Sequence, residues 1–205
     1  MRGVTLKILT LTLILSLAGM VELALAGGPP TNAVKITVDE VIRLLADPAL
    51  KAPGQKQRRR QLIKQAVDRR FDYEEMAKRS LPNWKRLSAA QRREFVDLFS
   101  TLLENSYAEK FERFSGEKVK FLGESRDGNR AEVRTVLVRK NDRMPINYRL
   151  LDKSQWLVYD VVIEGVSLVN NYRSQFSRVI SKSSYNDLVR RLKTKVDEQR
   201  RMERM

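Results

Sequence analysis

The spacing of hydrophobic residues along the chain changes twice, from a helical repeat to an alternating one and back again. Between residues 37 and 114 apolar side chains recur every three or four positions, as they do on one face of an α-helix. From residue 119 to residue 163 they recur mostly at every second position, as in a strand with one buried face. After Gly165 the helical spacing returns. This order predicts an α+β fold in which an antiparallel sheet of four strands is flanked by helices.

Helix start signals divide the first helical region. A Gly/Pro-rich segment at 27–36 should be loose, and Thr37-Val-Asp-Glu40 has the pattern of a capping box that opens a short helix. We expect further helices over 55–70 and after Asp72, and the longest one after a second capping box at Ser88. The apolar residues of the longest helix form one wide stripe: Phe95, Leu98, Phe99, Leu102, Leu103, Tyr107, Phe111 and Phe114.

The alternating region contains four strand candidates joined by short connections. They begin at Val119 and lie over 131–138, 146–150 and 156–163, with Asp127-Gly128 as a hairpin turn between the first two. The fourth strand alternates so that both of its faces are apolar and need cover. One face would carry Trp156, Val158 and Val162, and the other Leu157, Tyr159, Val161 and Ile163. Helices expected over 167–180 and from residue 184 could supply part of that cover.

The N-terminus has the layout of a cleavable secretory signal peptide. Arg2 and Lys7 precede an apolar run, and Ala24-Leu25-Ala26 provides the small residues of a cleavage site, so cleavage is expected after Ala26. The alternative is an uncleaved membrane anchor. The apolar run is shorter than the roughly 20 residues that a span needs, and Glu22 interrupts its end. A chain that is exported without cysteines suits a bacterial periplasm.

Composition removes much catalytic chemistry. The 205 residues include no Cys and no His, which excludes disulfides, a thiolate nucleophile, a Ser-His-Asp triad and a His- or Cys-ligated metal. We therefore expect no metal and no cofactor, and binding is favoured over catalysis. The net charge of +15, which becomes +14 after cleavage, attracts polyanions. In the periplasm these are anionic phospholipid or an acidic protein face rather than nucleic acid, or else the charge serves only solubility.

Two carboxylates lie in or beside the most apolar segment. Asp160 and Glu164 could serve as a tuned general base. Alternatively they pair with an arginine, for which Arg173 is a candidate, or cap the following turn. The apolar stripes are open to two interpretations as well, since they either form solid core or line a cavity.

The segment Trp156-Leu-Val-Tyr-Asp-Val-Val-Ile-Glu-Gly-Val-Ser-Leu-Val-Asn-Asn-Tyr-Arg-Ser-Gln-Phe176 resembles the signature of the MlaC family. Two other blocks resemble the central and final helices of that family. They are Phe71 to Ala77 with Trp84 and Ser88 to Phe95, and Ser184 to Leu192. The sequence departs from the family pattern at Pro82, where glycine is usual, and at Ser184, which also replaces a glycine.

The resemblance implies an NTF2-like sheet with a helical subdomain that encloses an apolar pocket. It implies a periplasmic phospholipid-binding component of Mla (toluene-tolerance) ABC transport systems, which maintain outer-membrane lipid asymmetry and need no enzymatic step. The partners would be a phospholipid, an outer-membrane lipoprotein–porin complex and an inner-membrane ABC permease with an MCE-domain subunit, and we expect a monomer. The domain would be 27–205 after the signal peptide 1–26, with a helical part at about 37–114 and 167–200 and the sheet at about 117–164.

Pocket-lining residues are then expected on both the sheet and the helices. The sheet candidates are Val136, Val138, Ile146, Tyr148, Trp156 and Val158, and the helical ones are Phe99, Leu103, Val166, Leu168, Tyr172 and Phe176. Two other classes of function stay open. One is an NTF2-like enzyme for a small apolar substrate with Asp160 or Glu164 as its base, and the other is a structural adaptor with a filled interior.

Overall fold

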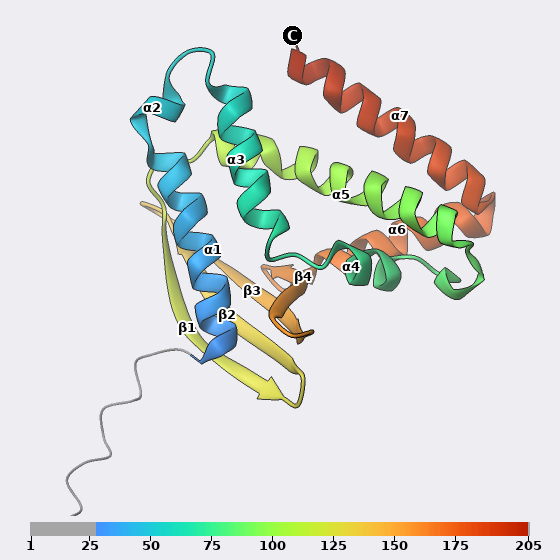
Figure 1. The fold of residues 1–205 in the computed structure, drawn as a ribbon, viewed down its shortest axis with the longest axis horizontal. Coiled ribbons are helices and arrows are strands. Elements are labelled where there is room, and N and C mark those ends of the chain that lie inside the picture. Colours follow the sequence, from blue (N-terminus) through green and yellow to red (C-terminus); the bar gives the residue numbers. More distant parts are fainter. Residues whose placement is uncertain (1–27, 205) are drawn as a thin grey trace, which may run out of the picture.

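A computed structural model describes residues 28–204 and shows one antiparallel sheet with helices before and after it in the chain (Figure 1). The strands follow one another in the order β1-β2-β3-β4-β5, so each is paired with its neighbour in sequence. The helices are α1 (Pro29–Ala46), α2 (Pro48–Lys51), α3 (Lys56–Asp68), α4 (Tyr73–Ser80), η1 (Trp84–Arg86), α5 (Ala89–Glu112), α6 (Leu168–Lys182) and α7 (Tyr185–Arg204). The strands are β1 (Lys118–Asp127), β2 (Arg130–Val138), β3 (Arg143–Asp152), β4 (Trp156–Ile163) and β5 (Val166–Ser167).

The α+β class is confirmed, but the predicted number of strands is wrong by one. The fifth strand has two residues, too few to show any period in the sequence. It pairs with the end of β4 through Val162↔Ser167 and Ile163↔Val166. The turn between them is formed by Glu164 and Gly165, both with positive φ. Glu164 is therefore an exposed turn residue.

The predicted start of the first helix is also wrong, since α1 begins at Pro29 and includes the segment expected to be loose. Proline suits the first turn of a helix because the N–H it lacks has no partner there. Thr37 lies within the helix, and its hydroxyl donates to the Ala33 carbonyl at 3.4 Å. The helix is fastened to β1 at its start, where the Thr31 N–H and hydroxyl donate to Glu124 Oε2 at 2.9 and 2.6 Å.

The other predicted helix starts are confirmed. The Asp72 carboxylate accepts the Glu75 N–H at 3.0 Å at the start of α4. At the start of α5, the Ser88 hydroxyl accepts the Gln91 N–H at 3.2 Å, and the Gln91 side chain accepts the Ser88 N–H at 2.9 Å. Such reciprocal bonds satisfy two N–H groups that a helix start leaves unpaired.

A bulge in β4 changes which side chains share a face of the sheet. Arg149 pairs with Asp160 and the next residue, Leu150, pairs with Val158, so Tyr159 has no partner on β3. A bulge reverses the alternation from that point onward. The predicted faces are therefore wrong for Val161, Val162 and Ile163. Trp156, Val158, Val161 and Ile163 all belong to the cluster that packs under α1.

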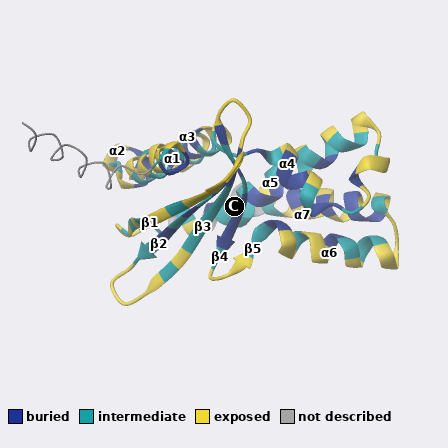
Figure 2. Cartoon of the chain, turned by 90° about the horizontal axis from the view of Figure 1, so that it is seen from below, coloured by how far each residue is buried: buried dark blue, intermediate teal, exposed yellow. Residues whose placement is uncertain are grey.

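Three buried clusters hold the molecule together, and Figure 2 shows them as dark segments facing one another between the helices and between α1 and the sheet. The first cluster joins α4, α5, α6 and α7 around Phe95 and Phe99. The second joins α1 through Val34 to the sheet. The third joins α1, α2 and α3 around Leu44, Leu45 and Ile63. The sheet with α1–α3 and the group α4–α7 thus have separate cores, which β4 and α6 connect.

Candidate functional site

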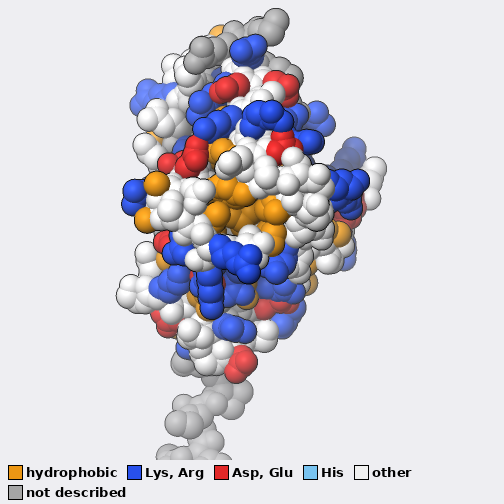
Figure 3. Space-filling model, turned by 90° about the vertical axis from the view of Figure 1, so that its right-hand side faces the viewer, with side chains coloured by type: hydrophobic (Ala, Val, Ile, Leu, Met, Phe, Trp, Pro, Cys, Tyr) orange, Lys and Arg blue, Asp and Glu red, His pale blue; other side chains and the backbone are white. Residues whose placement is uncertain are grey.

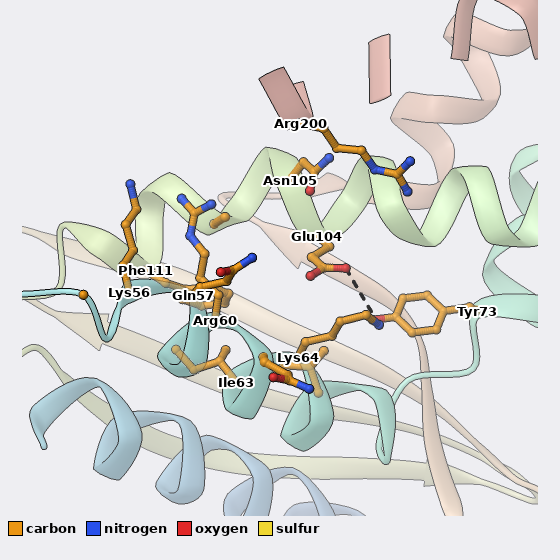
Figure 4. A pocket seen from close by; sticks show the side chains of 14 residues that line it. Lys56, Gln57, Arg60, Ile63, Lys64, Tyr73, Glu104, Asn105, Phe111 and Arg200 are labelled. Atoms are coloured by element: carbon orange, nitrogen blue, oxygen red, sulfur yellow. Dashed lines mark ion pairs between the residues drawn. The ribbon is translucent and has the colours of Figure 1, made fainter. Parts of the chain in front are cut away.

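A large cavity lies between α3 and the C-terminal half of α5, and the last part of α7 contributes to its wall (Figure 4). Its volume is about 740 Å³, and it opens to solvent. Its lining comes from four separate segments of the chain, so only the tertiary fold assembles it. The lining residues are Gly54, Lys56, Gln57, Arg60, Gln61, Ile63, Lys64, Val67, Tyr73, Glu104, Asn105, Ala108, Phe111 and Arg200.

The cavity has an apolar part and a charged part. Ile63 and Ala108 are buried, and they lie with Val67 and Phe111 on α3 and α5, the two helices that face each other, while Tyr73 adds its ring from the start of α4. The spacing of residues along α3 explains why the cavity has an apolar part and a charged part. On α3 the apolar residues are four positions apart, at 63 and 67, while basic residues recur at 56, 60 and 64 on an adjoining face. The same helices therefore offer an oily wall and a charged rim.

An ion pair on the rim joins α3 to α5. The Lys64 ammonium lies 3.8 Å from the Glu104 carboxylate, drawn as a dashed line in Figure 4, and 2.6 Å from Asp68. Asp68 also accepts the Tyr73 hydroxyl at 3.1 Å. Burial, reinforced by the Asp68 charge, raises the pKa of Tyr73 well above its usual value. Tyr73 therefore stays neutral and contributes its ring to the cavity lining.

None of the twelve expected lining residues belongs to this cavity. Four of them, Phe99, Leu103, Tyr172 and Phe176, lie in the core of α4–α7. The ring of Phe99 is 5.2 Å from that of Tyr172 and 5.7 Å from that of Phe176, in edge-to-face geometry. Such contacts are typical of a solid aromatic core.

The other eight are divided by the sheet. Trp156 and Val158 are buried under α1, with Ile146, Tyr148 and Leu168 packed against the same cluster. Val136 and Val138 point to the opposite face, because they pair with Pro145 and Arg143 rather than with the residues of that cluster. Val166 is 57% exposed. The six sheet candidates therefore do not lie on one face of the sheet.

Some of the residues that line the cavity lie on apolar stripes that the sequence predicts. Ile63, Val67 and Phe111 lie on the predicted apolar stripes, but a stripe does not reveal whether its partner helix touches it or stands off. Tyr73 and Ala108 carry no signal in the sequence that separates them from ordinary core residues.

The half-buried position of Tyr148 under α1 predicts a pH dependence of stability. Burial raises the pKa of Tyr148 to about 12, whereas the unfolded value is about 10. The unfolded state ionises first, so this contribution is complete below pH 10 and is lost as the pH rises to about 12. Tyr148→Phe should therefore lose less stability than the wild type over this interval, as measured by chemical denaturation at stepped pH. Equal losses in the two proteins would contradict the assignment.

Asp160 is a structural residue of the joint between the sheet and α6. Its carboxylate accepts from the Ser167 hydroxyl at 2.7 Å, the Val169 N–H at 3.1 Å and the Arg149 guanidinium at 3.2 Å. Its side chain is 4% exposed. The expected partner Arg173 is wrong, because Arg173 donates to the Arg79 carbonyl at 2.9 Å. Asp160 thus fastens the start of α6 to β3 and β4.

A smaller hollow of about 280 Å³ lies beside Asp160. Its lining includes Arg79, Arg149 and Arg173. Arg79 is held by Glu75 at 2.7 Å and stacks over the Tyr159 ring at 4.2 Å from the ring centroid. These contacts link α4, β4 and α6, so this hollow belongs to the joint between the two halves.

The surface at the α4–α7 end has an apolar patch with basic side chains around it. Viewed toward the α4–α7 end, hydrophobic side chains gather in one patch near the centre, with Lys and Arg side chains above and below it (Figure 3). Within residues 28–204, no helix combines the length and the apolar character that a membrane span requires. The same part of the chain contains no cluster of three or more acidic side chains arranged to hold a metal ion.

The fold and the hollow together define an α+β protein in which a sheet half and a helical half are joined around an open, apolar-walled cavity with a basic rim. Comparison with known proteins shows the family to which the chain belongs. The profile of the family described as MlaC protein matches residues 35–194. The chain therefore belongs to the MlaC family.

Individual relatives agree. The intermembrane phospholipid transport system binding protein MlaC of Haemophilus influenzae is 28% identical over 116 residues, which are 53% of this chain. The chain spans about half, 54%, of that relative's length. The structure of a phospholipid-binding protein from Ralstonia solanacearum, solved in complex with a phospholipid, is 26% identical with a TM-score of 0.75. That match covers 85% of this chain and 99% of the other.

Proposed function

We propose that this protein is a phospholipid carrier of the periplasm. It would hold the acyl chains of a glycerophospholipid in an apolar cavity while the headgroup stays in water. The observation that carries the proposal is the open cavity of about 740 Å³ between α3 and α5, in a fold shared with a protein whose structure contains a phospholipid. That volume lies within the range of about 300–1,000 Å³ typical of ligand sites.

A carrier of this kind solves a free-energy problem. Exposing an acyl chain costs about 0.8 kcal/mol per CH₂ group, so a chain of about 16 carbons costs roughly 13 kcal/mol in water. The Ile63, Val67, Ala108 and Phe111 side chains offer an apolar wall that would lower this cost. Binding and release then move a lipid without any bond being made or broken, and the function requires no catalytic residue, metal or cofactor.

Space for a second acyl chain would have to open beyond Tyr73. The Tyr73 ring is 6.1 Å from that of Phe71, and Phe71 packs against both the α4–α7 core and the cluster under α1. We propose that a second chain passes this aromatic pair and reaches the buried and half-buried candidates on either side. These are Phe99, Leu103, Tyr172 and Phe176 in one core and Ile146, Tyr148, Trp156, Val158 and Leu168 in the other.

Membership of the MlaC family supports a transport role. We propose that the protein, as a monomer, passes phospholipid between an outer-membrane lipoprotein–porin complex and an inner-membrane ABC permease with an MCE-domain subunit. Its net positive charge would favour anionic membranes and acidic docking faces within about 10 Å at ordinary salt. The proposed signal peptide, residues 1–26, lies outside the described residues.

Lipid extraction tests the proposal directly. We expect organic extracts of the protein, purified from the periplasm of a Gram-negative host, to contain about one phospholipid per chain by mass spectrometry. A second sample, purified under conditions that remove lipid and then mixed with vesicles, should regain it. Extracts without phospholipid in both samples would rule out the carrier, and a structural adaptor would then be the better interpretation.

A further inference from the structure

We propose that the basic rim of the cavity between α3 and α5 is an anion site that selects phospholipids with a net negative headgroup over zwitterionic ones. The inference rests on the proposed function and adds a substrate class to it. A cavity that only buries acyl chains would accept any headgroup equally. The lining of this cavity does more, since its polar part is strongly biased in charge.

The bias is visible in the lining residues. The lining contains four basic side chains, Lys56, Arg60, Lys64 and Arg200, and one carboxylate, that of Glu104. Two of the four have acidic partners just outside the lining, since Lys64 lies 2.6 Å from Asp68 and Arg200 lies 3.9 Å from Asp197. Figure 4 shows the Lys56 and Arg60 side chains extending from α3 in the same direction, toward α5. A phosphate at the mouth of the cavity would lie between these groups while its acyl chain contacted the apolar wall below.

The start of α3 adds to the positive potential. An α-helix carries a partial positive charge at its N-terminus, where acidic residues are stabilising. The first turn of α3 contains no acidic residue, and Gln55 makes no capping hydrogen bond with its side chain. The basic run from Lys56 to Arg60 thus occupies the end of the helix where cations are least favourable. A bound anion would relieve this repulsion.

Headgroup charge should therefore decide occupancy. Phosphatidylglycerol brings only the negative phosphate to the rim. Phosphatidylethanolamine brings an ammonium as well, which the rim repels. For partly exposed charges we expect about a fivefold preference for phosphatidylglycerol. The preference should be largest at about 0.01 M salt, where the Debye length is about 30 Å and charges interact over that range. It should nearly vanish at about 1 M, where the Debye length is about 3 Å.

The test is a competition between the two lipids. The lipid-free protein is mixed with vesicles containing equal amounts of phosphatidylglycerol and phosphatidylethanolamine with identical acyl chains, and the lipids it removes are measured by mass spectrometry. Lys56→Gln with Arg60→Gln should reduce the ratio from about five to about one. The control removes the same charge with Lys51→Gln and Arg58→Gln, two exposed neighbours outside the cavity, and should keep the ratio.

A third variant tests the rim without any change in α3, so a folding defect of that helix cannot explain its result. Arg200→Gln changes only α7 and should lower the ratio to about half. Sodium phosphate should lower the wild-type ratio no more than sodium chloride of equal ionic strength. A larger effect would mean that the rim binds free phosphate, which would overturn its assignment to the headgroup.

Failure of this inference and failure of the proposed function give different results. If the wild-type protein carries both lipids in equal amounts at low salt, the headgroup site is wrong and the carrier stands. If the double variant and its control shift the ratio alike, only overall charge matters, and the headgroup site is again wrong. If no lipid is carried at all, both proposals fall.

Discussion

Replacing Ala108 with phenylalanine is expected to weaken phospholipid binding roughly fiftyfold while the chain stays folded. Ala108 lies on α5 and is buried against the cavity. A phenyl group at this position would project into the hollow and displace about three methylene groups of an acyl chain. At about 0.8 kcal/mol for each, the loss is about 2.4 kcal/mol, or a factor of about 50. The measurement is the amount of lipid bound per chain at limiting lipid concentration.

The matched control is Ala90→Phe, the same change on the same helix. Ala90 is exposed in the first turn of α5 and does not line the cavity, so this variant should bind lipid like the wild type. Circular dichroism and a melting curve would show that both variants are folded. Normal lipid binding by a folded Ala108→Phe variant would place the acyl chains elsewhere, most simply in the cores that contain Phe99 or Trp156.

Replacing Asp160 with alanine is expected to lower the free energy of unfolding by about 3 kcal/mol. The substitution leaves the Val169 N–H and the Ser167 hydroxyl without their acceptor and removes the charge that Arg149 faces in a nearly buried position. For a chain of this size the melting temperature should fall by roughly 6–12 °C. Urea denaturation of the variant and the wild type measures the difference.

Asp39→Ala is the control for this prediction. Asp39 forms an exposed ion pair with Lys35 on one helix, and its loss should cost only about 0.3–0.5 kcal/mol. A similarly small effect at Asp160 would contradict the structural role. Asp160→Asn adds a test of the enzyme interpretation. Unchanged lipid binding by this variant would leave an enzyme without its proposed base.

Several local features could be predicted because they depend on neighbouring residues alone. The capping box at Ser88 and the cap at Asp72 are closed within three residues, so the sequence contains both partners of each hydrogen bond. The bounds of β4, 156–163, were predicted for the same reason, since period and turn signals are local. The resemblance over 156–176 led to the family that the profile match confirms.

Errors arose where a distant partner decided the outcome. The bulge at Tyr159 depends on how β4 pairs with β3, and it moved Val161 to the face under α1. The early start of α1 depends on Glu124, which is 93 residues from Thr31. Arg173 binds a carbonyl on α4 instead of Asp160, because the position of α6 against α4 is set by the whole helical core.

The amino-acid order by itself determined the class of fold, most of the helices and strands, and the absence of cysteine and histidine chemistry. Each of these follows from the residue types present or from contacts a few residues apart. Only the tertiary structure decided where space remains. The apolar residues of α3 and α5 would have formed solid core had the two helices touched along their length. Phe111 packs against the same cluster as Ile63, but elsewhere the two helices leave a cavity between them, and no periodicity in a single helix records that distance.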